Sequence, residues 1–332
     1  MRVLFGILIS VAALAEMPAP VIDMHLHALE YDQQGPPPLA MCTPHEEMPV
    51  WDQAKPYPEA FFDYYKNPKC ADPVWSPMSD EELLQRSLAD MQANNVYGVL
   101  SGLPPRVDTW VDAAPGRFLR GFWFRLDDAT PTPDELVKLY KEDRVEVVAE
   151  IVTQYQGILP DDQRLEPYWA AMEVNDIPAG IHIGPGPPGV IYLGAGNYRA
   201  RMHSALTLEE VLVKHPQLRV YIMHAGFPML DDLLAVLYAH PQVYVEVGII
   251  VYAMPREGFY SYLEGIFEAG FGNRVMFGSD QMVWPETIGR SIKVINEAPF
   301  LSEQQKRDVL FNNAARFLRL SDDEIARMHA GK

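Results

Sequence analysis

Hydrophobic and polar positions along the chain alternate between two patterns. Short apolar runs predict buried strands, and the stretches after them have apolar residues three or four positions apart, which predicts helices. The first clear helix begins at Ser79-Asp80-Glu81-Glu82, which has the spacing of a capping box, and extends to about residue 95. A strand over 96–101 is predicted directly after it.

The same alternation of strands and helices continues through most of the chain. Further strands are predicted over 117–124, 145–151, 178–183, 218–224, 243–247 and 274–278, and further helices over 133–142, 161–175, 206–214, 229–239 and 258–269. Together with an apolar strand that ends at His27, this gives eight strands alternating with helices. The pattern predicts an α/β fold of the parallel (β/α)8 TIM barrel type, with C-terminal helices over about 302–328. A doubly wound open sheet is the alternative.

Proline and aromatic residues dominate the segment over about 28–78, which follows the first strand. Its prolines, including the run Gly35-Pro36-Pro37-Pro38, oppose regular helix and central strand, so we expect an irregular segment. A loop of this length is rarely structureless in a compact domain, and we interpret it as a folded insertion that covers a site. Its aromatic residues, Trp51 among them, could contact a flat or apolar substrate or could only pack the insertion.

The first fifteen residues have the features of a secretory signal peptide. Arg2 gives a short positive start, residues 3–14 are apolar, and Ala13-Leu14-Ala15 offers a cleavage site. We therefore expect cleavage near Ala15, export to the periplasm or the medium, and a single barrel domain over 16–332. A buried first helix is the alternative, and no later apolar run reaches the length of a membrane span.

Charge and cysteine content limit the partners of the chain. The 27 basic and 45 acidic residues give a formal charge of −18, which would repel nucleic acid and anionic membrane surfaces. A small-molecule substrate fits this charge better, and a homo-oligomer is compatible with it. In an oxidising compartment Cys42 and Cys70 could form a disulfide across the insertion, or they could remain two separate thiols.

A pair of histidines ends the first predicted strand, in the sequence Val21-Ile22-Asp23-Met24-His25-Leu26-His27. Because side chains alternate along a strand, His25 and His27 should point to the same side, where two imidazoles could hold one metal ion. A strand end with two hydrogen-bonded or solvated histidines is the alternative.

Ionisable residues also end four later strands. These residues are Glu150, His182, His224 and Asp280. The carboxyl ends of all strands of a parallel barrel lie on one rim, so these side chains should meet His25 and His27 there. Imidazoles with carboxylates suit zinc or a similar divalent ion, and the pattern therefore predicts a metal centre.

These residues resemble the ligand pattern of a known family. His25-x-His27, His182, His224 and Asp280, in this order on a barrel, are similar to the amidohydrolase superfamily, in particular its amidohydrolase-related (amidohydrolase 2) branch of metal-dependent hydrolases and decarboxylases. Further matching phrases are Lys214-His215-Pro216, His224-Ala225-Gly226 with Pro228, Gly278-Ser279-Asp280 and Asn313-Ala314-Ala315-Arg316. The resemblance extends over about residues 20–320.

The resemblance implies a role for each matching residue. His25, His27 and Asp280 would bind a first ion, and Asp280 would also take a proton from water. His182 would bind the same ion or a second one. His224 would bind a second ion or, in a one-metal site, act as a base toward the water. Glu150 could bridge two ions, or it could accept a hydrogen bond from a ligand histidine. The ion would be zinc, in one or two copies, with manganese as another option.

Hydrolysis is the simplest reaction for such a site. We expect a metal-activated water to attack an ester, lactone or amide bond of a small molecule, with Asp280 and His224 as catalytic residues. The loop over 184–204 could present Tyr198 and Arg199 to the substrate, although the arginine could instead pair with surface acids. One alternative is non-oxidative decarboxylation of an aromatic or unsaturated acid, against which export argues. Another is a non-catalytic exported binding protein.

Overall fold

Parallel strands form the centre of the molecule in the computed structural model, which describes residues 18–331. The predicted signal peptide therefore lies outside the described residues. The barrel strands are β1 (Val21–Ala28), β4 (Val96–Gly102), β5 (Phe118–Arg120), β6 (Val148–Ile151), β7 (Ala179–His182), β8 (Val220–Met223), β9 (Tyr244–Glu246) and β10 (Val275–Met276). Each lies within or next to a predicted strand, and most are shorter than predicted.

The strands close into a barrel through contacts at two seams. Regular parallel pairing joins β1, β4 and β5 on one side and β6 to β10 on the other. The first seam is bridged by the parallel pair Gly121 and Val147, and at the second the Met24 N–H donates to the Phe277 carbonyl at 2.9 Å. Closure at both seams confirms the TIM barrel and excludes the open doubly wound sheet.

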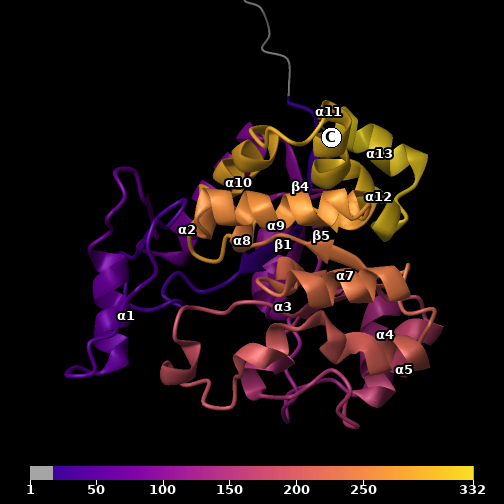
Figure 1. Ribbon diagram of the computed structural model, residues 1–332. Helices are drawn as coiled ribbons and strands as arrows, with labels where there is room; N and C mark the ends of the chain where they lie inside the picture. Colours follow the sequence, from indigo (N-terminus) through magenta and orange to yellow (C-terminus); the bar gives the residue numbers. More distant parts are fainter. Residues whose placement is uncertain (1–17, 332) are drawn as a thin grey trace, which may run out of the picture.

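Helices surround the barrel and follow the predicted order (Figure 1). The main ones are α2 (Asp80–Ala93), α3 (Pro104–Ala113), α4 (Pro133–Lys141), α5 (Glu166–Val174), α6 (Glu209–Lys214), α7 (Leu230–Ala239), α8 (Ile250–Ala253), α9 (Arg256–Glu268), α10 (Thr287–Asn296), α11 (Glu303–Arg307), α12 (Asn313–Leu318) and α13 (Asp322–His329). The Ser79 side chain accepts the Glu82 N–H at the start of α2, as the capping pattern predicts. Helices α3 and α10 lie outside the ranges predicted from the sequence. Helix α3 begins with two prolines in its first turn.

An irregularity in β1 divides its side chains between two core clusters, because the pairing of β1 with β4 shifts register between Asp23 and Leu26. On β1, Ile22 and Met24 belong to the cluster that fills the barrel interior together with Tyr97 and Val99 of β4. Leu26, between the two histidines, belongs instead to the larger cluster that packs against the outer helices. The two clusters leave the carboxyl end of β1 as the place where the histidine side chains can emerge.

The segment over 28–78 has more regular structure than expected. It contains the short antiparallel strands β2 (Ala40–Met41) and β3 (Val74–Trp75) and the helix α1 (Tyr57–Lys66), which lies at the left edge of Figure 1. The expectation of an irregular segment was wrong for α1 because Pro58 lies in its first turn, where the missing N–H has no helical partner to lose.

A disulfide between Cys42 and Cys70 closes a loop of the insertion. The two cysteines are 28 positions apart, so the bond restricts the unfolded chain over that length. Among the described residues, no helix is both long and apolar enough to pass through a membrane.

Replacing both cysteines with serine should lower the free energy of unfolding, because the loop over 42–70 gains chain entropy in the unfolded state. The expected loss is roughly 3.5 kcal/mol for a loop of this size. Urea unfolding of the variant and the wild-type protein would measure it. An unchanged unfolding midpoint would show that the insertion is held by its packing alone.

Candidate metal centre

The two histidines of β1 point into one buried space. His25 and His27 are 1% and 5% exposed, and their Nε2 atoms lie 3.0 Å apart. The strand alternation places both rings on the side opposite to Leu26, as predicted from the sequence. Two ring nitrogens at this separation can share one cation.

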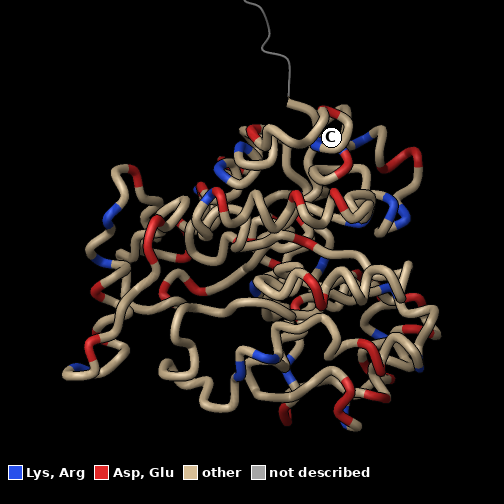
Figure 2. Tube along the Cα trace, in the orientation of Figure 1, with Lys and Arg blue, Asp and Glu red and all other residues tan. Residues whose placement is uncertain are grey.

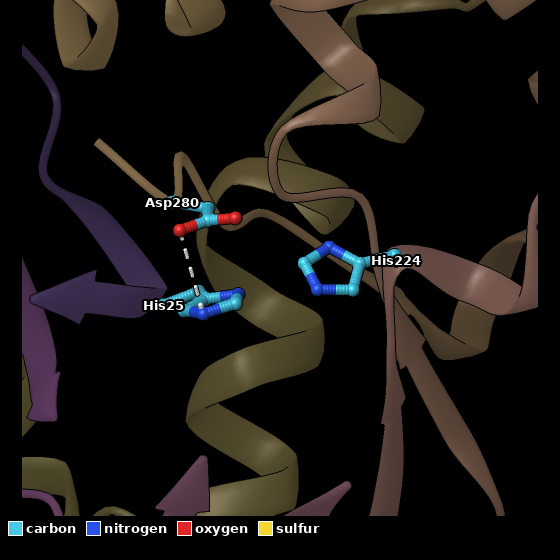
Figure 3. A group of neighbouring side chains, drawn as sticks. All are labelled: His25, His224 and Asp280. Carbon is cyan, nitrogen blue, oxygen red and sulfur yellow. Dashed lines mark ion pairs between the residues drawn. The ribbon is translucent and has the colours of Figure 1, made fainter. Parts of the chain in front are cut away.

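Residues from four other strands complete the site, and each is one that the sequence pattern singles out. Glu150 comes from β6, His182 ends β7, His224 follows β8, and Asp280 follows β10. The side chains of His25, His224 and Asp280 face one another across the rim (Figure 3), and their ligand atoms lie within 4.8 Å of one another. Two further groups, His25 with His27 and Glu150, and Glu150 with His182 and His224, meet the same limit.

Glu150 lies between two pairs of histidines. Its Oε2 atom is 3.7 Å from His25 Nε2 and 3.8 Å from His27 Nε2. Its Oε1 atom is 2.5 Å from His182 Nδ1 and 3.6 Å from His224 Nε2. One carboxylate therefore faces two separate sets of nitrogen donors.

Glu246 is the functional residue that the sequence prediction missed. It is fully buried on β9, where its carboxylate accepts from His25 Nδ1 at 3.1 Å and from the backbone N–H of His224 at 2.8 Å. The available signal was a carboxylate inside the apolar strand 243–247, since a buried carboxylate needs partners. Glu246 orients two candidate ligands at once.

Hydrogen bonds at Nδ1 determine which nitrogen carries the proton in the rings of His25 and His224. His25 Nδ1 donates to Glu246, and His224 Nδ1 donates to the Gly248 carbonyl at 2.9 Å. In the neutral rings Nε2 therefore carries a lone pair directed into the centre. Outer partners of this kind are typical of metal-binding histidines.

The buried carboxylates of the centre favour a positive charge beside them. Three carboxylates, those of Glu150, Glu246 and Asp280, are buried there. Burial lowers the pKa of His25, but the carboxylates of Asp280 and Glu246 outweigh it and raise this pKa well above its usual value. Burial raises the pKa of Asp280, yet His25 and His27 outweigh burial and lower it. The same charges would hold a divalent cation.

Polar atoms without partners indicate that the donor set fits a divalent ion. His27 Nδ1 and His182 Nε2 are buried and have no hydrogen-bond partner among the described residues. Asp280 Oδ1 lies only 3.0 Å from His27 Nε2, so two acceptor atoms approach each other unless a proton or a cation lies between them. Nitrogen and carboxylate donors are those that zinc and manganese accept.

Unusual backbone conformations aim two of these side chains. His224 and Asp280 have positive φ angles of 61° and 53°. Such a conformation costs a residue with a Cβ atom about 1 kcal/mol or more. The Asp280 N–H donates to the His25 carbonyl at 2.8 Å, and the His224 N–H donates to Glu246, which offsets part of this cost.

An apolar cavity of about 540 Å³ extends from the centre toward the insertion and the loop over 184–204. Tyr198, predicted to contact substrate, lies on its wall and donates to His203 Nε2 at 2.5 Å, because His203 Nδ1 donates to the Phe227 carbonyl. Burial and the neighbouring His182 lower the pKa of His203 to about 4, so its ring is neutral at pH 7.

The other two residues predicted to bind substrate lie differently. Arg199 lines the cavity, but its guanidinium donates to the carbonyls of Gly196 and Tyr198 in its own loop. Trp51 is outside the described lining of the cavity. Its ring packs on Tyr192 at 4.8 Å between centroids and so joins the insertion to the loop.

The closed parallel barrel and the cluster of histidines and carboxylates on its rim are the features of metal-binding (β/α)8 enzymes. The family model described as Amidohydrolase matches residues 22–320, and the chain therefore belongs to the amidohydrolase family. This membership makes the chain an enzyme of the metal-dependent hydrolase and decarboxylase type. No curated protein matches the sequence.

Solved structures share the fold at low sequence identity. An uncharacterized TIM-barrel protein from Bordetella bronchiseptica has a TM-score of 0.59 at 17% identity, covering 93% of this chain and 100% of the other. A 5-carboxyvanillate decarboxylase from Sphingomonas paucimobilis has a TM-score of 0.58 at 15% identity, with 92% and 100% covered. A probable 2-pyrone-4,6-dicarboxylic acid hydrolase from Acinetobacter baumannii has a TM-score of 0.55 at 15% identity, with 90% and 99% covered.

Replacing Glu246 with glutamine should weaken metal binding about 10- to 100-fold, because His25 loses the carboxylate that orients its ring. Competition with a fluorescent chelator would measure the affinity, and circular dichroism would report the fold. Glu59→Gln, an exposed position on α1, is the matched control. Equal affinity in the Glu246 and Glu59 variants would contradict the orienting role.

Proposed function

We propose that the chain is a metal-dependent hydrolase that cleaves an ester, lactone or amide bond in a small, largely apolar molecule. The observation that carries this proposal is the position of Glu150, with one oxygen toward His25 and His27 and the other toward His182 and His224. A carboxylate in this position can bridge two cations, and paired cations serve hydrolytic chemistry in many enzymes.

The proposed ligands fall into two sets. His25, His27 and Asp280 would hold one ion, and His182 and His224 would hold a second, with Glu150 shared between the sets. Zinc is the ion that we propose, and manganese is compatible with the same donors. Such an ion supplies a Lewis acid that polarises a carbonyl group and lowers the pKa of water toward neutrality.

Asp280 is the proposed catalytic base. Its Oδ1 atom lies 3.0 Å from His27 Nε2, which favours the ionised carboxylate, and the residue lies on the wall of the apolar cavity. The carboxylate can therefore accept a proton from the attacking water and deliver it to the leaving oxygen or nitrogen. In its neutral form His224 presents a lone pair at Nε2, so it acts as a ligand or as an acceptor for the water.

The cavity supports an uncharged, apolar group next to the bond that is cleaved. Its walls include Met41, Phe61, Tyr65 and Trp284. Arg199 is the one lysine or arginine among its described lining residues, and its guanidinium donates to its own loop. A flat hydrocarbon ring would bury its surface there at roughly 25 cal/mol per Å² of apolar area.

Decarboxylation is a second candidate. The aromatic lining would also accept an aromatic acid, and one of the structurally similar proteins is a 5-carboxyvanillate decarboxylase. The two reactions differ in their products, because a hydrolase consumes water and releases two fragments, whereas a decarboxylase releases carbon dioxide.

Zinc- or manganese-loaded protein should contain two ions per chain, and Glu150→Gln should contain one or fewer, because the amide cannot bridge two cations. Mass spectrometry of the metals after gel filtration would count them, with Glu59→Gln as the control. A single ion in the wild-type protein in the presence of excess metal would rule out the paired arrangement.

Asp280→Asn should reduce turnover by about 10²- to 10⁴-fold while the protein keeps its fold and part of its metal, since the amide cannot accept the proton. A screen of aromatic esters, lactones and amides, with carboxylated phenols included, would identify the substrate for this measurement. Removal of metal with a chelator should abolish the same activity. Release of carbon dioxide from a carboxylated phenol, with no ester, lactone or amide cleaved, would contradict the hydrolase proposal and support decarboxylation.

A further inference from the structure

Two clefts meet at the metal centre, and their walls differ. The apolar cavity and a second cleft of about 860 Å³ both reach the centre and share part of their walls. Asp280, Tyr155 and five further residues line both, while His27, Glu150 and His182 line only the second cleft. A molecule whose reacting bond lies at the centre can therefore extend toward Trp284 in the first cleft and toward Arg125 in the second. Each volume is in the range of small-molecule sites.

Polar and charged side chains line part of the second cleft. Exposed Arg125 lies on its wall together with Trp123 and Gln33. Arg125 is the one lysine or arginine among the described residues that line this cleft. Among the described lining residues, Arg125 is therefore the lysine or arginine side chain that can select an anionic group.

Arg125 has donors free for a ligand. Its Nε atom is 3.7 Å from Asp127 Oδ2, and the two side chains are 43% and 46% exposed, so this pair is weak. The guanidinium lies 5.7 Å from the centroid of the Trp123 ring. A guanidinium beside an indole offers both a charged fork for a carboxylate and a flat surface for a ring.

The overall charge of the molecule makes this position distinctive. The formal charge is −18, and acidic residues occur along most of the trace in Figure 2. An anionic group in this cleft meets the carboxylates of Asp32, Glu150 and Asp280. Arg125 supplies the opposite charge, so it can hold an anionic group away from Glu150 and Asp280.

We propose that the substrate joins two unlike groups across the bond that is cleaved: an apolar ring in the closed cavity, and a carboxylate-bearing ring or chain that reaches Arg125. This inference rests on the proposed hydrolase function and specifies its substrate class. Water adds its oxygen to the carbonyl carbon, the carbon–oxygen or carbon–nitrogen bond breaks, and the released oxygen or nitrogen takes a proton. No other reactant is needed.

Binding of a non-cleavable probe tests the inference apart from catalysis. In 4-benzylbenzoate two rings are joined by a methylene group and one carries a carboxylate, whereas 4-benzylbenzamide is its neutral counterpart. Calorimetry on zinc-loaded protein should show about tenfold tighter binding of the carboxylate. Arg125→Met should remove this preference, and Arg125→Lys should keep part of it.

Arg164→Met is the matched control, because Arg164 is also exposed and pairs with an aspartate two residues away, Asp162. It should leave the preference unchanged. Equal binding of the two probes by the wild-type protein would overturn the inference. A preference for the carboxylate that survives in Arg125→Met would also overturn it, since the anion would then be held at the metal centre.

Kinetics separate this inference from the proposed function. Phenyl esters with a carboxylate on either ring would be compared with the same esters in which a carboxamide replaces the carboxylate. The anionic esters should have the lower KM in the wild-type protein, and this difference should disappear in Arg125→Met. Ester cleavage without any Arg125-dependent preference would reject the inference alone. Arg125-dependent binding of the probe without cleavage of any ester would reject hydrolysis and leave the assignment of Arg125 intact.

Discussion

The burial of three carboxylates beside four histidines is the constraint on which the rest of the site depends. Glu150, Glu246 and Asp280 lie in the interior, where an uncompensated charge costs several kcal/mol. Burial alone disfavours the histidine protons that would compensate them, although Asp280 and Glu246 outweigh burial at His25 and raise its pKa. A divalent cation would neutralise the carboxylates and accept the lone pairs of the histidines. The buried side chains on this rim therefore favour a bound cation.

Contacts from outside the set of candidate ligands hold the ligand side chains in position. Glu246 fixes the His25 ring and the His224 backbone together, and the Asp280 backbone is tied to the His25 carbonyl. The left-handed backbone at His224 and Asp280 is tolerated because these contacts offset its cost. The insertion and the loop over 184–204 then enclose the apolar cavity, joined by the packing of Trp51 on Tyr192.

The sequence was sufficient to predict the barrel and the six candidate ligands because both follow from local periodicity. Alternation along β1 directs His25 and His27 to one side, and parallel strands bring their carboxyl ends to one rim. Glu246 was missed because a lone acid in a strand gives no sign of its partners. Helix α1 was missed because the prolines suggested a break, and Arg125 reaches the second cleft through tertiary folding that periodicity does not encode.

The most direct test of the central claim is anomalous X-ray scattering from crystals of metal-loaded protein at the zinc and manganese edges. The account predicts anomalous density enclosed by His25, His27 and Asp280, with further density between Glu150 and the pair His182 and His224. A well-ordered site with no anomalous density, in protein that keeps its activity after treatment with a chelator, would contradict it.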